Sequence, residues 1–99
     1  MELTGKCKEE FKGWLSRLPR YEYYTKEYIL ELWNNYSESM QYGVYVDYFD
    51  SVGSYISVSG LVLSKTYICD ISVISNVEHY YDGFSTRQEA RTKAIEKAN

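Results

Sequence analysis

The sequence predicts one α+β domain, in which two N-terminal helices precede a three-stranded antiparallel meander and a C-terminal helix. Three observations lead to this prediction. The chain has 99 residues, which is enough for one hydrophobic core but not for two. Its apolar residues recur every three or four positions before residue 40 and after residue 86, but they alternate between residues 43 and 75, as in strands. No repeat, linker or low-complexity tract interrupts the chain, so residues 1–99 are expected to form a single domain in the order α-α-β-β-β-α.

Two amphipathic helices are predicted at the N-terminus. The first extends from about Thr4 to Leu18 and ends at Pro19, because the residue before a proline is disfavoured in helical geometry. The second follows Thr25, whose hydroxyl can cap the first turn, and continues to about Ser39. The connection between them is short, so we expect the two helices to form a helical hairpin.

Three segments alternate between apolar and polar residues, which predicts strands over residues 43–49, 54–60 and 66–75. Turn signals at residues 50–53 (DSVG) and at Ser64-Lys65 separate them, as in an antiparallel meander. The segment NVEHYYDG, which follows the third strand, is predicted to be a loop. One side of the sheet is expected to face the core, and its residues are Val44, Val46, Ile56, Val58, Cys69, Ile71 and Val73.

The C-terminal helix has the clearest start of any element. Thr86 is placed to cap it, Glu89 follows three residues later, and Asp82-Gly83 supplies the preceding turn. Ala90 and Ala94 lie on one side, where small side chains would let the helix approach the sheet closely. Arg91 lies within the same apolar stripe, so its stem is expected to cover the sheet while the guanidinium reaches water or a strand carboxylate.

The distribution of charge argues against several functions. The net charge is −3 for the whole chain and −4 for residues 43–82, so the predicted sheet is acidic and a poor platform for nucleic acid. No apolar stretch is long enough for a signal peptide or a membrane span, which predicts a cytoplasmic protein without membrane contact. In that compartment Cys7 and Cys69 are expected to stay reduced.

The sequence also predicts that the protein is not an enzyme and holds no metal or cofactor. The single histidine, His79, has only Glu78 and Asp82 as nearby carboxylates, and a specific metal site usually recruits three or four ligands from rigid elements. Cys69 is expected in the middle of a strand on the core side, where a thiol is inert. No catalytic residue is therefore assigned.

The outward side of the predicted sheet is the candidate binding surface. It would carry Tyr45, Asp47, Phe49, Tyr55 and Asp70. Exposed aromatic residues are typical of protein interfaces, and the two carboxylates would favour a partner with a basic surface. The sequence therefore predicts a protein-interaction module with a protein partner. The alternative is that the N-terminal helical hairpin covers this side of the sheet.

The C-terminal segment TRQEARTKAIEKA resembles the last helix of double-stranded RNA-binding domains. In register with that helix lie Thr86, Arg87, Ala90, Arg91, Ala94, Ile95 and Ala98. The resemblance implies a helix whose basic residues contact the phosphates of duplex RNA. Here those residues would be Arg87, Arg91, Lys93 and Lys97. Gln88 replaces the second lysine of the family pattern, and DSVG replaces its histidine-bearing loop.

A second resemblance covers about the last fifteen residues. The pattern F-x-T-x-x-E-A-x-x-x-A-I, formed by residues 84–95, is similar to the endings of many small proteins carried by bacterial phages and mobile elements. This resemblance implies an accessory or inhibitory role that depends on binding a partner.

Overall fold

The computed structural model describes residues 1–73 and 76–99, with the side chains of residues 76, 77 and 79–82 left out. The elements, in chain order, are α1 (Gly5–Ser16), the short 3₁₀ helix η1 (Pro19–Tyr21), α2 (Lys26–Asn35), α3 (Glu38–Ser51), β1 (Tyr55–Leu61), β2 (Thr66–Val73), β3 (Asn76–Phe84) and α4 (Arg87–Ala98). The strands form an antiparallel sheet in the order β1-β2-β3. The predicted α+β class, the meander and the C-terminal helix are confirmed.

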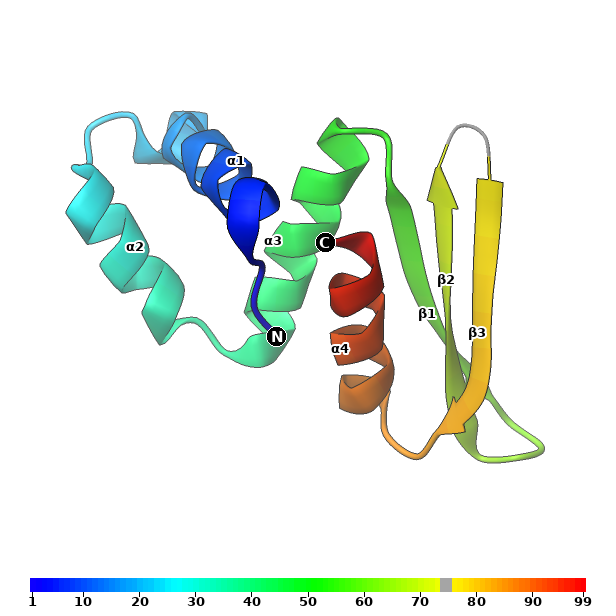
Figure 1. Ribbon diagram of the computed structural model, residues 1–99. Helices are drawn as coiled ribbons and strands as arrows, with labels where there is room; N and C mark the ends of the chain where they lie inside the picture. Colours follow the sequence, from blue (N-terminus) through cyan, green and yellow to red (C-terminus); the bar gives the residue numbers. More distant parts are fainter. Residues whose placement is uncertain (74–75) are drawn as a thin grey trace.

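The helices lie on one side of the sheet in successive layers (Figure 1). Helix α4 packs directly on β1 and β2, and α3 contacts both α4 and β1. Helices α1 and α2 lie beyond α3, on the side away from the sheet. None of the helices in the described part of the chain is long and apolar enough to cross a bilayer.

The prediction of a strand over residues 43–49 is wrong, because these residues belong to helix α3. The predicted second helix ends at Asn35, and the Ser37 hydroxyl then accepts a hydrogen bond from the Met40 amide (3.2 Å), which starts a new helix. The buried side chains of α3 are Tyr45, Tyr48 and Phe49, at helical spacings of three and four. The alternation of valine and tyrosine in this segment therefore concealed a helical period.

The prediction of a loop after the third strand is also wrong. Residues 76–84 form β3, which pairs with β2 so that Ile71 lies opposite Glu78 and Asp70 opposite His79. The register shifts between Tyr67 and Cys69, close to Gly83, whose positive φ of 68° suits glycine. The predicted strands at 54–60 and 66–75 are therefore found as β1 and β2, and the third strand of the meander is β3 instead of residues 43–49.

The remaining turns and strand faces agree with the sequence. The Gly53 amide donates to the Asp50 carbonyl oxygen (3.2 Å), and Gly53 has a φ of 82°, so residues 50–53 form a turn, here between α3 and β1. Ile56 lies opposite Ile71, and Val58 lies opposite Cys69, on the side of the sheet that faces α4. Thr86 caps α4 through a hydrogen bond from the Glu89 amide (3.1 Å).

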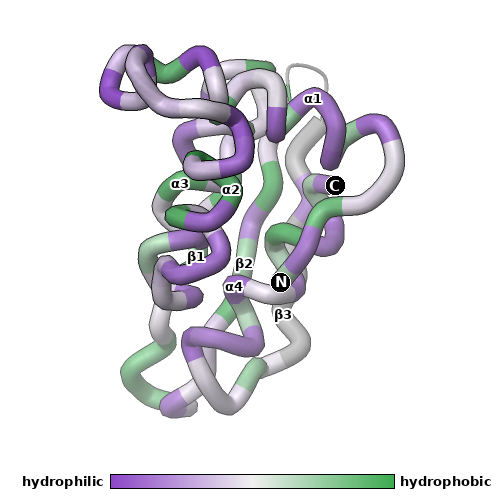
Figure 2. Tube along the Cα trace, turned by 90° about the vertical axis from the view of Figure 1, so that its left-hand side faces the viewer, coloured by the Kyte–Doolittle hydropathy of each residue, from purple (hydrophilic) through white to green (hydrophobic). Residues whose placement is uncertain are grey.

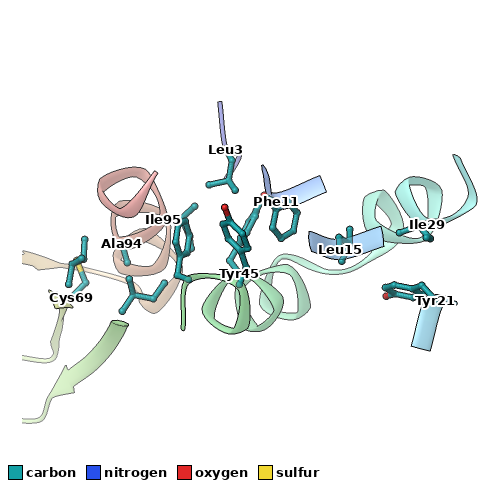
Figure 3. Packing of buried hydrophobic residues seen from close by; sticks show 13 residues of the cluster. Leu3, Phe11, Leu15, Tyr21, Ile29, Tyr45, Cys69, Ala94 and Ile95 are labelled. Atoms are coloured by element: carbon teal, nitrogen blue, oxygen red, sulfur yellow. The ribbon is translucent and has the colours of Figure 1, made fainter. Parts of the chain in front are cut away.

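A single hydrophobic core joins the sheet to all four α-helices. Figure 3 shows it as a row of side chains that starts at Cys69 on β2 and continues through Ala94 and Ile95 on α4. It then passes Tyr45 on α3 and reaches Phe11 on α1. Ala94 and Cys69 have no exposed surface, so α4 lies as close to the sheet as small side chains allow.

Enlarging Ala94 should therefore destabilise the fold. We expect Ala94→Leu to cost about 1–3 kcal/mol, because the added atoms have no space between α4 and β2. Glu96→Leu adds the same side chain to the exposed side of α4 and should change the free energy of unfolding by no more than about 0.5 kcal/mol. Urea unfolding measures both, and equal effects would contradict this packing of α4.

Candidate interaction surface

The structure does not bring the five predicted binding residues together. Tyr45 and Phe49 lie on α3 and are only 3% and 2% exposed. Asp47 is exposed on the opposite side of the same helix. Only Tyr55, on β1, and Asp70, on β2, lie on the outward side of the sheet. The predicted aromatic and acidic face is wrong, because its first strand is a helix whose rings enter the core.

The outward side of the sheet is not covered by the N-terminal helices. Figure 1 shows α1 and α2 on the far side of α3, while the face of the sheet opposite α4 has no helix over it. Tyr55 is 56% exposed there, and its neighbours Ser57 and Ser59 are exposed as well. This face of the sheet is therefore exposed and not covered by the helical hairpin. Along β1, however, it carries mainly serine and one aromatic residue.

The four basic residues named by the RNA-binding resemblance lie in two rows on α4. Arg87 and Arg91 form one row, and Lys93 and Lys97 form the other, about 120° around the helix. The Arg87 guanidinium lies 5.0 Å from the centre of the Tyr67 ring.

The Arg91 guanidinium contacts helix α3, not a strand carboxylate as the sequence suggested. Its guanidinium lies 5.0 Å from the centre of the Tyr42 ring and donates a hydrogen bond to the Ser39 hydroxyl (3.0 Å), both on α3. It therefore links α4 to α3.

The side chains that the structure describes form no metal-binding cluster. In this part of the chain, no group of three or more His, Cys, Asp or Glu residues is arranged to hold a metal ion. Of the three residues considered above, the side chains of His79 and Asp82 lie outside the described ones. A cavity of about 220 Å³ between α1, α2 and α3 is lined by Phe11, Trp33 and Tyr45. A larger and more open hollow of about 480 Å³ lies beside the β1–β2 turn and is lined by Lys65 and Arg87 among others.

Exposed apolar side chains gather along β1 and at its two ends. The tip of the β1–β2 hairpin carries Val62 and Leu63, which are 90% and 101% exposed, and Leu61 beside them is also exposed. At the other end of β1, Val52 and Tyr55 are exposed. We call Val52, Tyr55, Leu61, Val62 and Leu63 the β1 surface. Figure 2 shows the apolar colour of the hairpin tip at the lower edge of the molecule.

Sequence reasoning missed this surface because it assigned no role to Leu61–Leu63, which lie between the predicted strand 54–60 and the Ser64-Lys65 turn. The available signal was the break in alternation: three consecutive apolar residues directly before a Ser-Lys turn cannot all face the core of a hairpin. The charge around the tip was also readable. Residues 51–69 contain no acidic residue, and Lys65 and Arg87 both border the tip.

Strand β1 is also an edge strand without the usual protection of such strands. Edge strands often carry lysine, proline or a bulge, which prevent pairing with another chain. The β1 sequence YISVSGL has no charge and no proline, and its register with β2 is continuous over all seven pairs. Val58 faces the same side as Cys69 but is only half-buried, whereas Cys69 is fully buried. The hydrogen-bonding edge of β1 that faces away from β2 is therefore open.

The different positions of Phe49 and Tyr55 can be tested by truncation. Phe49→Ala should cost about 3–5 kcal/mol, because it removes a fully buried ring and leaves a cavity. Tyr55→Ala should cost less than about 1 kcal/mol, since its ring lies mostly in water. Chemical denaturation of the two variants measures the difference, and comparable losses would contradict the assignment of residues 38–51 to a helix.

Burial of the Tyr45 hydroxyl should make the fold sensitive to alkali. Burial, assisted by the charge of Glu2, raises the pKa of Tyr45 from 10 to about 12. Its contribution to stability is complete below the ordinary pKa near 10 and is lost as the pH rises through about 12. Tyr45→Phe removes this titration. The thermal midpoint of the variant should therefore fall less than that of the native chain between about pH 9 and about pH 11.

A matched control separates this effect from general alkaline destabilisation. Tyr23 is 91% exposed, so Tyr23→Phe should leave the alkaline decrease in thermal midpoint unchanged. If Tyr45→Phe and Tyr23→Phe gave the same alkaline profile, the Tyr45 hydroxyl would not be the group responsible.

Comparison with known proteins adds no assignment to this geometry. The two resemblances of the C-terminal segment remain predictions from the residues alone. No protein-family model matches the chain, and neither a curated protein nor a solved structure does.

Proposed function

We propose that this chain is a binding protein without catalytic activity, which holds another polypeptide at the edge of β1 and at the hairpin tip. The observation that carries the proposal is the exposure of Val62 and Leu63 beside an open strand edge. Burial of one such side chain against a partner contributes about 1.5–3 kcal/mol. The side chains of the β1 surface together can therefore support specific association.

The open edge supplies a second source of affinity. An extended segment that pairs with β1 would form main-chain hydrogen bonds with it, while apolar side chains at the strand ends would select the partner. Such strand addition needs an edge without charge, proline or bulge, and β1 has this composition. The two features occur on the same strand, which favours one binding surface over two.

The charge beside the tip favours a partner with acidic groups. Lys65 and Arg87 border the tip, and residues 51–69 carry no carboxylate. The prediction of a basic partner depended on Asp47 and Asp70 lying next to exposed rings of Tyr45 and Phe49. Since those rings are buried, that argument no longer applies. Complementary charge would mainly increase the rate of encounter and orient the partner.

Two observations support a role without catalysis. Cys69 is fully buried in the centre of the sheet, where no substrate reaches its sulfur. Burial also raises the pKa of the Cys7 thiol, which keeps it protonated and weakly nucleophilic at neutral pH. In this proposal the chain acts as an accessory or inhibitory protein through binding alone.

Site-specific photo-crosslinking tests the binding surface. A photoreactive amino acid replaces Val62 at the hairpin tip in one preparation and the exposed Glu27 of α2 in a control preparation. Irradiation in the native cells should crosslink a polypeptide to position 62 and none to position 27. Adding Leu63→Asp should lower the crosslinking yield at position 62 severalfold, because a buried carboxylate opposes apolar docking.

Denaturing electrophoresis and mass spectrometry of the crosslinked peptide identify the product and the contact site. Equal yields at positions 62 and 27, or a yield at position 62 that Leu63→Asp does not change, would contradict the proposed surface.

A further inference from the structure

The outward side of strand β1 is nearly symmetric about the central position, Val58, whereas on the inward side Ile56 mirrors Gly60. On the outward side, Ser57 and Ser59 flank it, and the larger Tyr55 and Leu61 lie three residues away in either direction. A sequence with this symmetry can pair with a second copy of itself in the antiparallel direction, because each residue then meets its mirror position. The strand is therefore complementary to itself as well as open.

We propose that two copies of the chain associate through β1, antiparallel and around a two-fold axis at Val58, to form a six-stranded sheet. This inference rests on the proposed function, since it names a second copy of the chain as the occupant of the β1 surface. Residues directly opposite each other in antiparallel strands point to the same side of the sheet. Tyr55 of one copy therefore packs against Leu61 of the second copy, twice across the axis.

The same register brings the hairpin tip of one copy to the turn before β1 of the other. The pairing itself ends at Tyr55 and Leu61, because residues 62–65 form the β1–β2 turn and residues 52–53 form the turn before β1. Tyr55 and Leu61 lose exposure through the register. The exposed Val62 of one copy lies at the same end of the combined sheet as the exposed Val52 of the other.

The charges at the ends of β1 agree with this arrangement. Symmetric pairing brings identical residues near the axis, so a charged central strand would repel its copy, and β1 carries no charge. The nearest charged residues are Asp50 at one end and Lys65 at the other, and both are exposed. Asp50 lies at the end of helix α3, just before β1, and Lys65 lies in the turn after this strand, so the antiparallel arrangement brings Lys65 of one copy and Asp50 of the other to the same end of the combined sheet.

The helices of the two copies would lie on the same side of the combined sheet. Figure 1 shows α3 inclined to the sheet, with its C-terminal end near the start of β1 and its N-terminal end farther away. The two-fold axis places the second α3 at the opposite end of the paired strands. Helix α4 packs on both β1 and β2, on this same side.

A pair of double variants at Ser57 and Ser59 tests the register. Both side chains are exposed, and Ser57 of one copy lies opposite Ser59 of the second. The blocking variant, Ser57→Lys with Ser59→Lys, places two lysines opposite each other at both pairs. The restoring variant, Ser57→Lys with Ser59→Asp, places lysine opposite aspartate instead. The two variants share the change at Ser57, which lies next to Asp70 on β2 and suits a lysine there.

Sedimentation velocity over a concentration series measures the association. The native chain should shift from monomer to dimer, the blocking variant should raise the dissociation constant about tenfold or more, and the restoring variant should return it close to the native value. Circular dichroism confirms that each variant is folded. Isotope-filtered NMR on a mixture of labelled and unlabelled native chain should also show contacts between the Tyr55 ring and the Leu61 methyl groups of the second copy.

Several outcomes would overturn the inference. A native chain that stays monomeric at all concentrations, an unchanged dimer in the blocking variant, or no recovery in the restoring variant each contradict the pairing at Val58. If a variant does not fold, the NMR contacts in the native chain decide. A monomer that still crosslinks a different polypeptide at position 62 would refute the second copy and leave the proposed function intact, whereas a monomer without crosslinks would refute both.

Discussion

The fold depends on the burial of one aromatic face of α3. The centroid of the Tyr45 ring lies 4.9 Å from that of Phe11 on α1 and 5.0 Å from that of Trp33 on α2. The centroids of the Phe11 and Trp33 rings are 5.0 Å apart. The same helix contacts α4 and β1. Because α3 packs both on α1 and on the α4–sheet layer, its rings join two parts that would each be too small for a stable core.

This use of tyrosine has an electrostatic consequence. A buried tyrosine contributes a large apolar ring, but its hydroxyl must be kept neutral or hydrogen-bonded. The hydroxyls of Tyr21 and Tyr36 are hydrogen-bonded to each other (2.7 Å). Tyr45 donates a long hydrogen bond to the Met1 carbonyl oxygen (3.4 Å), and burial keeps its hydroxyl protonated. The core therefore combines close packing with a sensitivity to high pH that leucine or phenylalanine would not produce.

The same packing explains why binding is assigned to the sheet. Once Tyr45, Tyr48 and Phe49 are inside, the exposed side of α3 has little apolar surface apart from Met40. Exposed apolar residues remain along β1, where the strand edge is open and the hairpin tip projects into solvent. A hydrogen bond from Arg91 to the Ser39 hydroxyl joins α4 to α3. The interaction surface is thus a consequence of how the core is filled.

The sequence by itself determined the features that depend on neighbouring residues. Thr86 and the alanines of α4, the break at Pro19, the Asp50–Gly53 turn and the alternation around Ile56 and Cys69 all act locally, and all were predictable. Tertiary structure alone decided between helix and strand for residues 43–49, because the segment fits both periods and only Phe11, Trp33 and α4 supply partners for a helical face. Tertiary structure also decided where the candidate surface lies. Tyr45 is buried and Leu63 is exposed because of contacts between residues far apart in the chain, which local sequence does not specify.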